Sequence, residues 1–288
     1  MMMKPLRSQS TLLAMAMAVL ALACNSNSSK APSDHAPATE KKPEAKTPPA
    51  PKGPVGTIVG TVKFDGAAPE MPELLRGADP FCAQTTMKAE TVVVNENGTL
   101  RNVFARIAPG EVPPVAAPDA PVVVDQTQCM YRPRVQGAVV GQTIAVKNSD
   151  GTMHNVHGRA LAMGERMGTR SLFNMGQPKG APNATYKVES GVEVVALKCD
   201  VHGWMKGFVV ISDNPYFSTT GKDGTFRIEN VPVGTHKVQL WHELYGVKTA
   251  EVTVEEGKEA TVTVSYSPAD NPMAGDTSGA AAAKGSGD

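Results

Sequence analysis

The sequence predicts an all-β protein built from two β-sandwiches, on the basis of three observations. Short β-branched runs recur along the chain and end at turn-forming pairs such as Asp65-Gly66, Asn97-Gly98 and Glu256-Gly257. The chain has 27 glycines and 23 prolines, which suits many short strands joined by turns. No helical periodicity of useful length appears, and Asp79–Met87 has room for at most one or two helical turns.

The N-terminal residues have the composition of an export signal. Lys4 and Arg7 precede the apolar run Leu12–Ala23, which is too short to span a bilayer and is typical of a secretory signal. The ending Ala21-Leu22-Ala23-Cys24 resembles a bacterial lipoprotein cleavage site, and a plain signal peptide is the alternative. The resemblance implies a signal segment at residues 1–24, lipidation of Cys24, and a membrane-anchored protein that faces the periplasm or the cell surface.

Two further segments have too little apolar surface to fold. Residues 25–54 are mostly Ser, Asn, Pro, Ala, Lys and Glu, and residues 268–288 are rich in Gly, Ala and Asp. We expect a disordered linker and a disordered tail, because neither segment can offset its conformational entropy. Lys+Arg and Asp+Glu are equal at 28 each, so net charge does not favour nucleic acid or an anionic membrane surface. We therefore expect membrane contact through the lipid anchor and no nucleic-acid partner.

The folded body is expected to begin with a strand at Gly56–Phe64, followed by a hairpin of Val92–Asn95 and Leu100–Ile107. Five more short strands are expected, at Val122–Val124, Ala138–Val140, Thr143–Lys147, Gly191–Leu197 and Gly207–Ile211.

The stretch Leu161–Asn183 has little strand character and is expected to be irregular. Its methionines Met163, Met167 and Met175 are interpreted as loop packing, and a soft-metal lip beside a metal site is the alternative.

One short window of the chain has three side chains that can ligate a metal. Cys199, His202 and Met205 follow the spacing Cys-x-x-His-x-x-Met. Cys and Met are soft ligands and His is borderline, so the set favours copper over magnesium, calcium or manganese. A fourth donor is needed, and the best candidate is His154. Two His, one Cys and a weak axial Met form the ligand set of a blue-copper electron-transfer site.

The four cysteines can each be given a role. Cys24 is the proposed lipid attachment point and Cys199 the proposed metal thiolate, which leaves Cys82 and Cys129. A secreted protein would normally pair these two as a disulfide. Closing a loop of that length stabilises by about 4 kcal/mol in the chain-entropy model. The alternative is a pair of free buried thiols.

Two motifs resemble the ligand motifs of the plastocyanin-like cupredoxins: Asn148–Asn155 and Cys199–Met205, within a region of roughly Val122–Asp213. The resemblance implies a Greek-key cupredoxin sandwich that binds one type 1 copper ion. The ligands it implies are His154, Cys199, His202 and Met205.

The same resemblance implies roles for residues around the ligands. Asn155 matches the residue that ties the two ligand loops together. The ring edge of His202 matches a solvent-facing electron port, with Gly203 and Trp204 as an apolar collar where a redox partner protein docks. The interval from His202 to Met205 is shorter than in most plastocyanins, so the length of the axial bond stays open.

The C-terminal part of the body, Thr220–Val264, reads as alternating strands. Asp223-Gly224-Thr225-Phe226, Pro232-Val233-Gly234 and Val238 resemble the carboxypeptidase regulatory-like (transthyretin-like) β-domain. About fifty residues are too few for a full sandwich of this type. The predicted division is a copper domain at 55–213 and a regulatory-like domain at 214–267, and the alternative is that residues 55–110 pair with the C-terminal sandwich.

Zinc is the first alternative to copper. His154, His157, Cys199 and His202 are all zinc-competent ligands. Residues three apart on a strand point to opposite faces, so His154 and His157 do not easily converge. Zinc also leaves Met205 without a role.

Catalysis is the second alternative, with Cys199 and His202 as a nucleophile and its base. The sequence suggests no third orienting residue and no second copper site, so we expect a protein that is not an enzyme.

A binding module is the third alternative. The C-terminal β-domain, with His236, Trp241 and His242, could dock an envelope partner while copper is structural or is carried and stored. Strand packing is the simpler interpretation of these three residues. The favoured function is electron transfer by one type 1 copper in the periplasm or at the cell surface.

Overall fold

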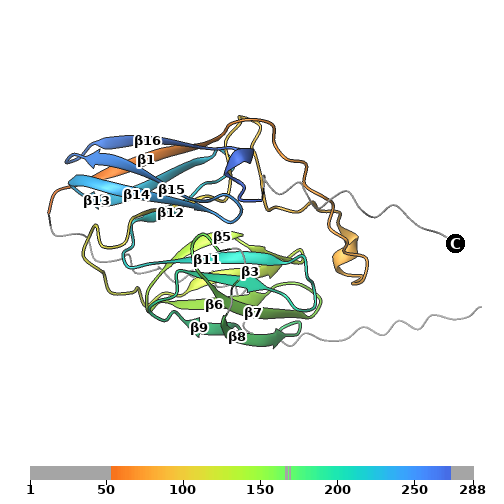
Figure 1. Cartoon of the computed structure of the whole chain (residues 1–288). Coiled ribbons are helices and arrows are strands. Elements are labelled where there is room, and N and C mark those ends of the chain that lie inside the picture. The colour runs from red at the N-terminus through yellow and green to blue at the C-terminus, as the bar shows by residue number, and fades with distance from the viewer. Residues whose placement is uncertain (1–52, 166–167, 169, 274–288) are drawn as a thin grey trace, which may run out of the picture. The chain divides into compact units, whose positions relative to one another are not determined.

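A computed structural model describes residues 53–165, 168 and 170–273 (Figure 1). The regular elements in these residues are β-strands and two short 3-10 turns, η1 (Cys82–Gln84) and η2 (Pro268–Asp270). The predicted all-β class is therefore confirmed. Among the residues described, no helix has both the length and the apolar character needed to cross a bilayer. The proposed signal segment with Cys24, almost all of the linker, and most of the tail lie outside the described residues.

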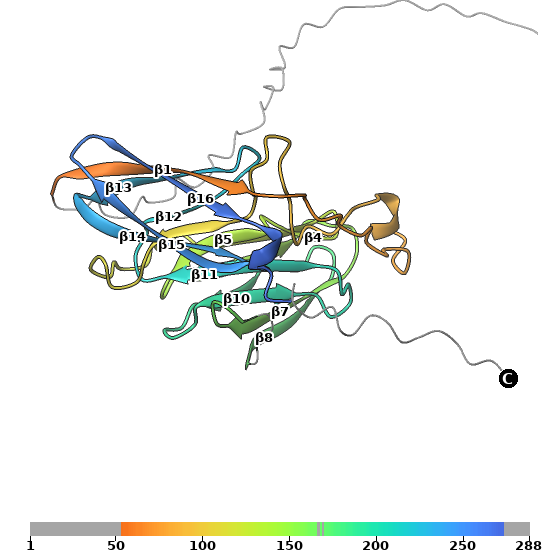
Figure 2. The same cartoon turned by 45° about the horizontal axis from the view of Figure 1, so that its top comes forward.

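The first sandwich is made of a five-stranded and a four-stranded sheet. The larger sheet has the spatial order β5 (Val135–Val139), β11 (Lys206–Ser212), β10 (Val194–Lys198), β7 (His154–Leu161), β8 (Arg170–Gln177). The smaller sheet has the order β4 (Met130–Arg132), β3 (Val122–Thr127), β6 (Thr143–Asn148), β9 (Ala184–Lys187). Figure 2 shows β10, β7 and β8 side by side. The chain passes repeatedly between the sheets, so β3–β6 and β5–β11 pair in parallel while their other neighbours are antiparallel.

The central strands of the larger sheet are apolar on both faces. Val195 and Leu197 of β10 point into the core between the two sheets of the first sandwich. Val194 belongs to a second cluster on the opposite face, and Ala196 packs against that cluster. A strand that is covered on both sides needs a continuous apolar run rather than an alternating one. The sequence Val-Val-Ala-Leu before the ligand window satisfies this requirement.

The second sandwich combines strands from both ends of the folded chain. One sheet has the order β13 (Thr225–Pro232), β1 (Val55–Phe64), β16 (Glu259–Tyr266). The other has the order β12 (Phe217–Thr219), β2 (Phe104–Ile107), β14 (Gly234–His242), β15 (Gly246–Val254). Strands from the range 55–110 thus pair with the C-terminal strands, and the first sandwich is an insertion between β2 and β12. Gly60 of β1 is required where it stands, because a Cβ there would collide with the ring of Phe226.

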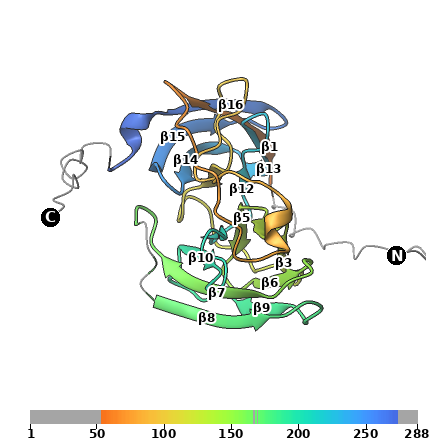
Figure 3. The same cartoon turned by 90° about the vertical axis from the view of Figure 1, so that its right-hand side faces the viewer.

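Apolar contacts and buried charges join the two sandwiches. Phe208 and Trp241 make an edge-on ring contact with centroids 5.4 Å apart. Arg106 of β2 donates to the carbonyl of Ile211 on β11. The outer face of the five-stranded sheet is thereby covered by the sheet that contains β14 (Figure 3).

The expected hairpin of Val92–Asn95 and Leu100–Ile107 is confirmed around its turn only. Val94 bridges Leu100, and the N–H groups of Asn95 and Arg101 donate to the carbonyls of Thr99 and Val93. Beyond the turn, Phe104–Ile107 pairs with β12 and β14 instead. A second expectation about secondary structure is wrong. Within the supposedly irregular stretch Leu161–Asn183, the chain forms β8. This strand is at a sheet edge, pairs only with β7, and is largely exposed or half-buried, so it needs no run of β-branched residues.

The ion pair between Arg134 and Glu243 supplies a test of how the sandwiches are joined. Its side chains are 4% and 7% exposed. Removing one charge of a buried pair leaves the other without a counter-charge, so we expect Arg134→Met to lower the free energy of unfolding by about 3–5 kcal/mol. Combining it with Glu243→Leu should restore most of the loss, as measured by denaturant unfolding. A double variant as unstable as Arg134→Met would contradict this account.

Candidate metal centre

The ligand window is the turn between two paired strands. Cys199 directly follows β10, and the cross-strand pair Lys198–Lys206 closes the turn before β11. Within the turn, the N–H of His202 donates to Cys199 Sγ at 3.3 Å. The N–H of Met205 donates to the carbonyl of His202 at 2.9 Å. These bonds fix the turn, and strand pairing fixes both of its ends.

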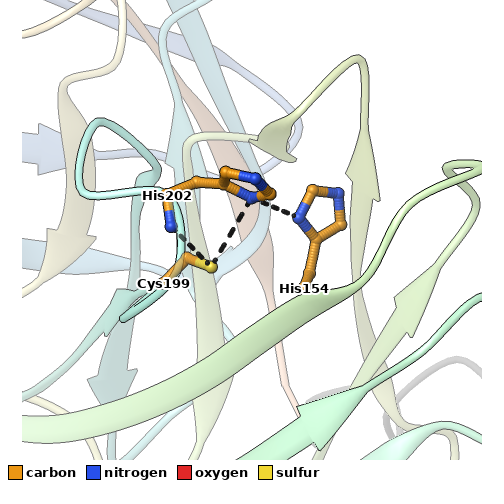
Figure 4. A group of neighbouring side chains, drawn as sticks. All are labelled: His154, Cys199 and His202. Atoms are coloured by element: carbon orange, nitrogen blue, oxygen red, sulfur yellow. Dashed lines mark hydrogen bonds between the residues drawn. The ribbon is translucent and has the colours of Figure 1, made fainter. Parts of the chain in front are cut away.

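Three of the four predicted ligands converge in the interior (Figure 4). Nδ1 of His154 is 2.9 Å from Nδ1 of His202, and Cys199 Sγ is 3.9 Å from the same His202 atom. The ligand atoms of all three residues lie within 4.8 Å of one another. Their side chains are buried, with His154 fully inaccessible. Metal bonds of about 2.0 Å to nitrogen and 2.3 Å to sulfur place two donors of one ion about 3–4 Å apart, so this donor set fits a single soft or borderline ion.

Met205, the fourth predicted ligand, is fully buried in the same hydrophobic cluster as Cys199. It comes from the same turn as the other two ligands of the window. Its position in the core beneath that turn agrees with a thioether ligand and also with apolar packing.

Asn155 connects the strands that supply the ligands. Its backbone N–H donates to Cys199 Sγ at 3.3 Å, and its side-chain oxygen accepts from the N–H of Asp200 at 3.1 Å. Its amide nitrogen donates to the carbonyl of Met175 on β8. Asn155 therefore ties the start of β7 to the ligand turn, as the resemblance to cupredoxins implies.

Each ligand imidazole has a carboxylate partner, which the sequence analysis missed. Asp150 Oδ2 is 2.8 Å from Nε2 of His154, and Asp79 Oδ2 is 3.0 Å from Nε2 of His202. A carboxylate at Nε2 holds the proton there and leaves the lone pair of Nδ1 for a metal. Asp150 lies inside the motif that contains His154, so its acidic character was a usable signal. Asp79 is far away in sequence and gave none.

The carboxylates also determine the charge of the metal-free site. Burial opposes the charge on Asp150, but hydrogen bonds from His154 and from the N–H groups of Cys129 and Gln128 outweigh it and lower its pKa. Burial likewise opposes a charge on His154, yet Asp150 and Cys199 raise its pKa to about 9.

Cys199 is buried, which alone would raise the pKa of its thiol. Hydrogen bonds from His154 and from the N–H groups of Asn155 and His202 reverse the effect and lower this pKa. The hydrogen bonds therefore shift the thiol toward the thiolate, which is the form of cysteine that binds metal.

The expectation that His202 presents a ring edge to solvent is wrong. The residue is only 2% exposed. Asp79 contacts its Nε2, Cys82 Sγ is 3.9 Å from the same atom, and the ring of Trp204 is tilted beside it with centroids 4.9 Å apart. The segment that covers the ring comes from the long connection between β1 and β2 and was not expected near the site.

The predicted disulfide between Cys82 and Cys129 is confirmed, with Cα atoms 5.7 Å apart. Cys199 is the free cysteine of the described chain. The disulfide attaches the covering segment to the loop between β3 and β4.

The residues of the rival hypotheses have other partners. His157 is on the opposite face of β7 from His154, with its ring nitrogens 3.1 Å from Asp200 and 2.9 Å from Ser171, so it does not join the donor set. In the second sandwich, His236 Nε2 lies 2.7 Å from the carbonyl of Pro232. His242 is buried and stacks on Tyr245.

Comparisons with known proteins match parts of the chain. A family model described as polysaccharide lyase family 4, domain II, matches residues 182–262, which run from the first sandwich into the second. No curated protein matches.

Solved structures similar to this chain include amicyanins and another cupredoxin. A Cu(I) amicyanin variant is 27% identical over 38% of this chain and 98% of its own, with a TM-score of 0.27. A reduced amicyanin variant is 28% identical over the same shares, also at 0.27. A purple cupredoxin from Nitrosopumilus maritimus is 20% identical over 32% of this chain and 99% of its own, at 0.26.

Removing the disulfide tests whether the segment around Asp79 and Cys82, which covers the ring of His202, is a stable part of the fold. We expect Cys82→Ala with Cys129→Ala to lower the free energy of unfolding by about 4 kcal/mol, because the unfolded chain loses a constraint. Denaturant titration measures the loss, and reduced wild-type protein is the matched control and should fall equally. A wild-type protein whose stability ignores reductant would contradict the prediction.

Proposed function

We propose that this protein is a copper-binding electron-transfer protein with one type 1 site. His154, Cys199 and His202 supply the strong ligands, and Met205 is the weak axial one. The observation that carries the proposal is the convergence of two Nδ1 atoms and the sulfur of Cys199 in a buried site. Bound copper would supply a one-electron change between Cu(II) and Cu(I).

The surrounding residues suit a site that changes charge without changing shape. N–H groups of Asn155 and His202 donate to Cys199 Sγ, which stabilises its negative charge. The ligand turn is fixed at both ends by strand pairing, so its donors can move little. Burial of all four predicted ligands excludes water and supports a function without a substrate at the metal. We therefore propose that the protein is not an enzyme.

Electrons would leave beside the ligand turn through Trp204 rather than through an exposed His202. Trp204 is partly buried, contacts the ring of His202, and donates from Nε1 to the carbonyl of Cys129. Val201 and Met153, which precede the two ligand histidines in the chain, are 53% and 51% exposed. We propose that these apolar side chains surround the docking point of a redox partner protein.

Location outside the cytoplasm belongs to the same proposal. The disulfide Cys82–Cys129 is of the kind that persists in oxidising compartments. Lipidation of Cys24 would anchor the protein to a membrane, facing the periplasm or the cell surface. The second sandwich is proposed to be a regulatory-like β-domain that supports the copper sandwich.

Replacing the thiolate tests the site directly. We expect Cys199→Ser to abolish the intense visible band of the copper-loaded protein while its circular dichroism spectrum stays that of the wild type. His157→Gln is the matched control: it removes a buried imidazole of β7 outside the donor set and should keep the band. A band that persists in Cys199→Ser, or that disappears in His157→Gln alone, would contradict the ligand assignment.

The docking face can be tested without changing the ligands. We expect Val201→Ser and Trp204→Leu to slow electron self-exchange, since they reduce apolar contact and the ring path to His202, while the EPR spectrum is retained. Val233→Ser, at an exposed apolar side chain of the second sandwich, is the control and should leave the rate unchanged. Equal rates in all three variants would exclude this face.

A further inference from the structure

We propose that Asp79 is a positioning residue of the metal centre, which fixes the tautomer of His202 and lowers the reduction potential of the site. The inference rests on the proposed copper function. It concerns a carboxylate on a segment outside both ligand motifs, Pro72–Ala89, which we call the cover segment.

The cover segment is a closed loop with its own internal bonds. Its two ends pair through the bridge from Glu73 to Lys88 and through the N–H of Leu74, which donates to the carbonyl of Met87 at 2.8 Å. Between them, Arg76 is only 4% exposed, and its guanidinium donates to the carbonyl of Thr85 at 3.1 Å. The loop therefore has a defined shape of its own.

A hydrogen bond, a disulfide and a ring contact hold the cover segment on the first sandwich. Arg76 also donates to the carbonyl of Gln128 at 2.6 Å. The disulfide joins Cys82 to the adjacent Cys129. The ring of Phe81 packs beside Gly151, in the motif that precedes His154, where a Cβ would collide with it. The segment is thus fixed to the same loops that flank the metal ligands.

The two oxygens of Asp79 have separate tasks. Oδ1 accepts from the N–H groups of Phe81 and Cys82, at 2.8 and 3.3 Å, and so shapes the start of the 3-10 turn. Oδ2 accepts from Thr152 Oγ1 at 2.8 Å and faces Nε2 of His202 at 3.0 Å. Four donors surround one carboxylate, and only one of them belongs to a metal ligand. A purely structural role would explain the contacts of Oδ1 and would leave the contact to His202 unexplained.

The contact at Oδ2 has a chemical consequence. It holds a proton on Nε2 of His202, so Nδ1, which faces Cys199 and His154, presents its lone pair to a metal. A negative partner also makes the imidazole a stronger donor, which favours Cu(II) over Cu(I). The effect is larger in a buried site than in water, because the local dielectric constant is low. Asp150 holds His154 in the same way, so both imidazoles are oriented by carboxylates.

Asp79→Asn tests the contact with His202 separately from the hydrogen bonds to the 3-10 turn. If its oxygen keeps the bonds to the turn, its NH₂ group faces Nε2 and disfavours a proton there. We expect His202 to shift toward the Nδ1–H tautomer in the metal-free protein, seen by ¹⁵N NMR. In the copper-loaded protein we expect the affinity for Cu(II) relative to Cu(I) to fall about tenfold, which is a rise of 59 mV in midpoint potential.

Three further variants serve as controls. Asp125→Asn removes a carboxylate of similar exposure, 23% against 17%, that is paired with Lys147 and touches no ligand, and it should leave the tautomer unchanged. Asp79→Glu restores a carboxylate and should restore the potential in part. Thr152→Val removes one donor from Oδ2 and leaves the carboxylate for His202, so it should lower the potential and remains informative if Asp79→Asn fails to fold.

The outcomes separate this inference from the proposed function. A wild-type protein that gives no visible band with copper overturns both. A wild-type protein with the band, together with an unshifted potential in Asp79→Asn and Thr152→Val, overturns only the role of Asp79. An unchanged tautomer in metal-free Asp79→Asn also overturns it. A potential that rises equally in Asp125→Asn would show a general charge effect and would contradict the specific contact.

Discussion

The site depends on the antiparallel register between β10 and β7. Lys198 pairs with His157 and Val194 with Leu161, so the end of β10 lies beside the start of β7. That register brings Cys199, just after β10, next to His154, the first residue of β7. A slip of one residue would turn every side chain of the strand to the other face and would remove His154 from the core. Such a slip would also exchange the residues that β10 contributes to its two clusters, Val195 and Leu197 on one face and Val194 and Ala196 on the other.

A second constraint is the need to hydrogen-bond every buried polar atom. His154 and His202 are almost inaccessible, and a buried imidazole without partners would cost free energy. Asp150 and Asp79 satisfy the Nε2 atoms, and each carboxylate is in turn satisfied by backbone N–H groups. The disulfide joins two of these N–H donors, because Cys82 donates to Asp79 and Cys129 donates to Asp150. The disulfide therefore links the segment that contains Asp79 to the loop that binds Asp150, and each of these carboxylates contacts one ligand imidazole.

The sequence predicted what depends on local order and missed what depends on distant contacts. Cys199, His202 and Met205 were found because three donors share one turn, and His154 because it lies in the motif Asn148–Asn155, which resembles a cupredoxin ligand motif. The edge strand β8 was missed because an exposed strand that pairs on one side has no strong apolar pattern. The exposure of His202 was wrongly expected because Asp79 and Cys82 reach it from more than a hundred residues away. Neither the residues around Asp79 nor those around His202 have a periodicity or spacing that predicts this contact.

The second sandwich contributes to the site through the face that it covers. Phe104, Val210 and Trp241 fill the outer side of the five-stranded sheet, so β10 and β11 are packed from both directions. The inserted sandwich begins after β2 and ends before β12, and these strands pair with each other, Arg106 opposite Phe217. Both ends of the insertion are therefore fixed at one place in the second sandwich. The ligand turn follows directly from a strand that is packed on both faces. This packing helps a turn of seven residues, 199–205, to hold three donors in place, together with the cover segment that contacts His202.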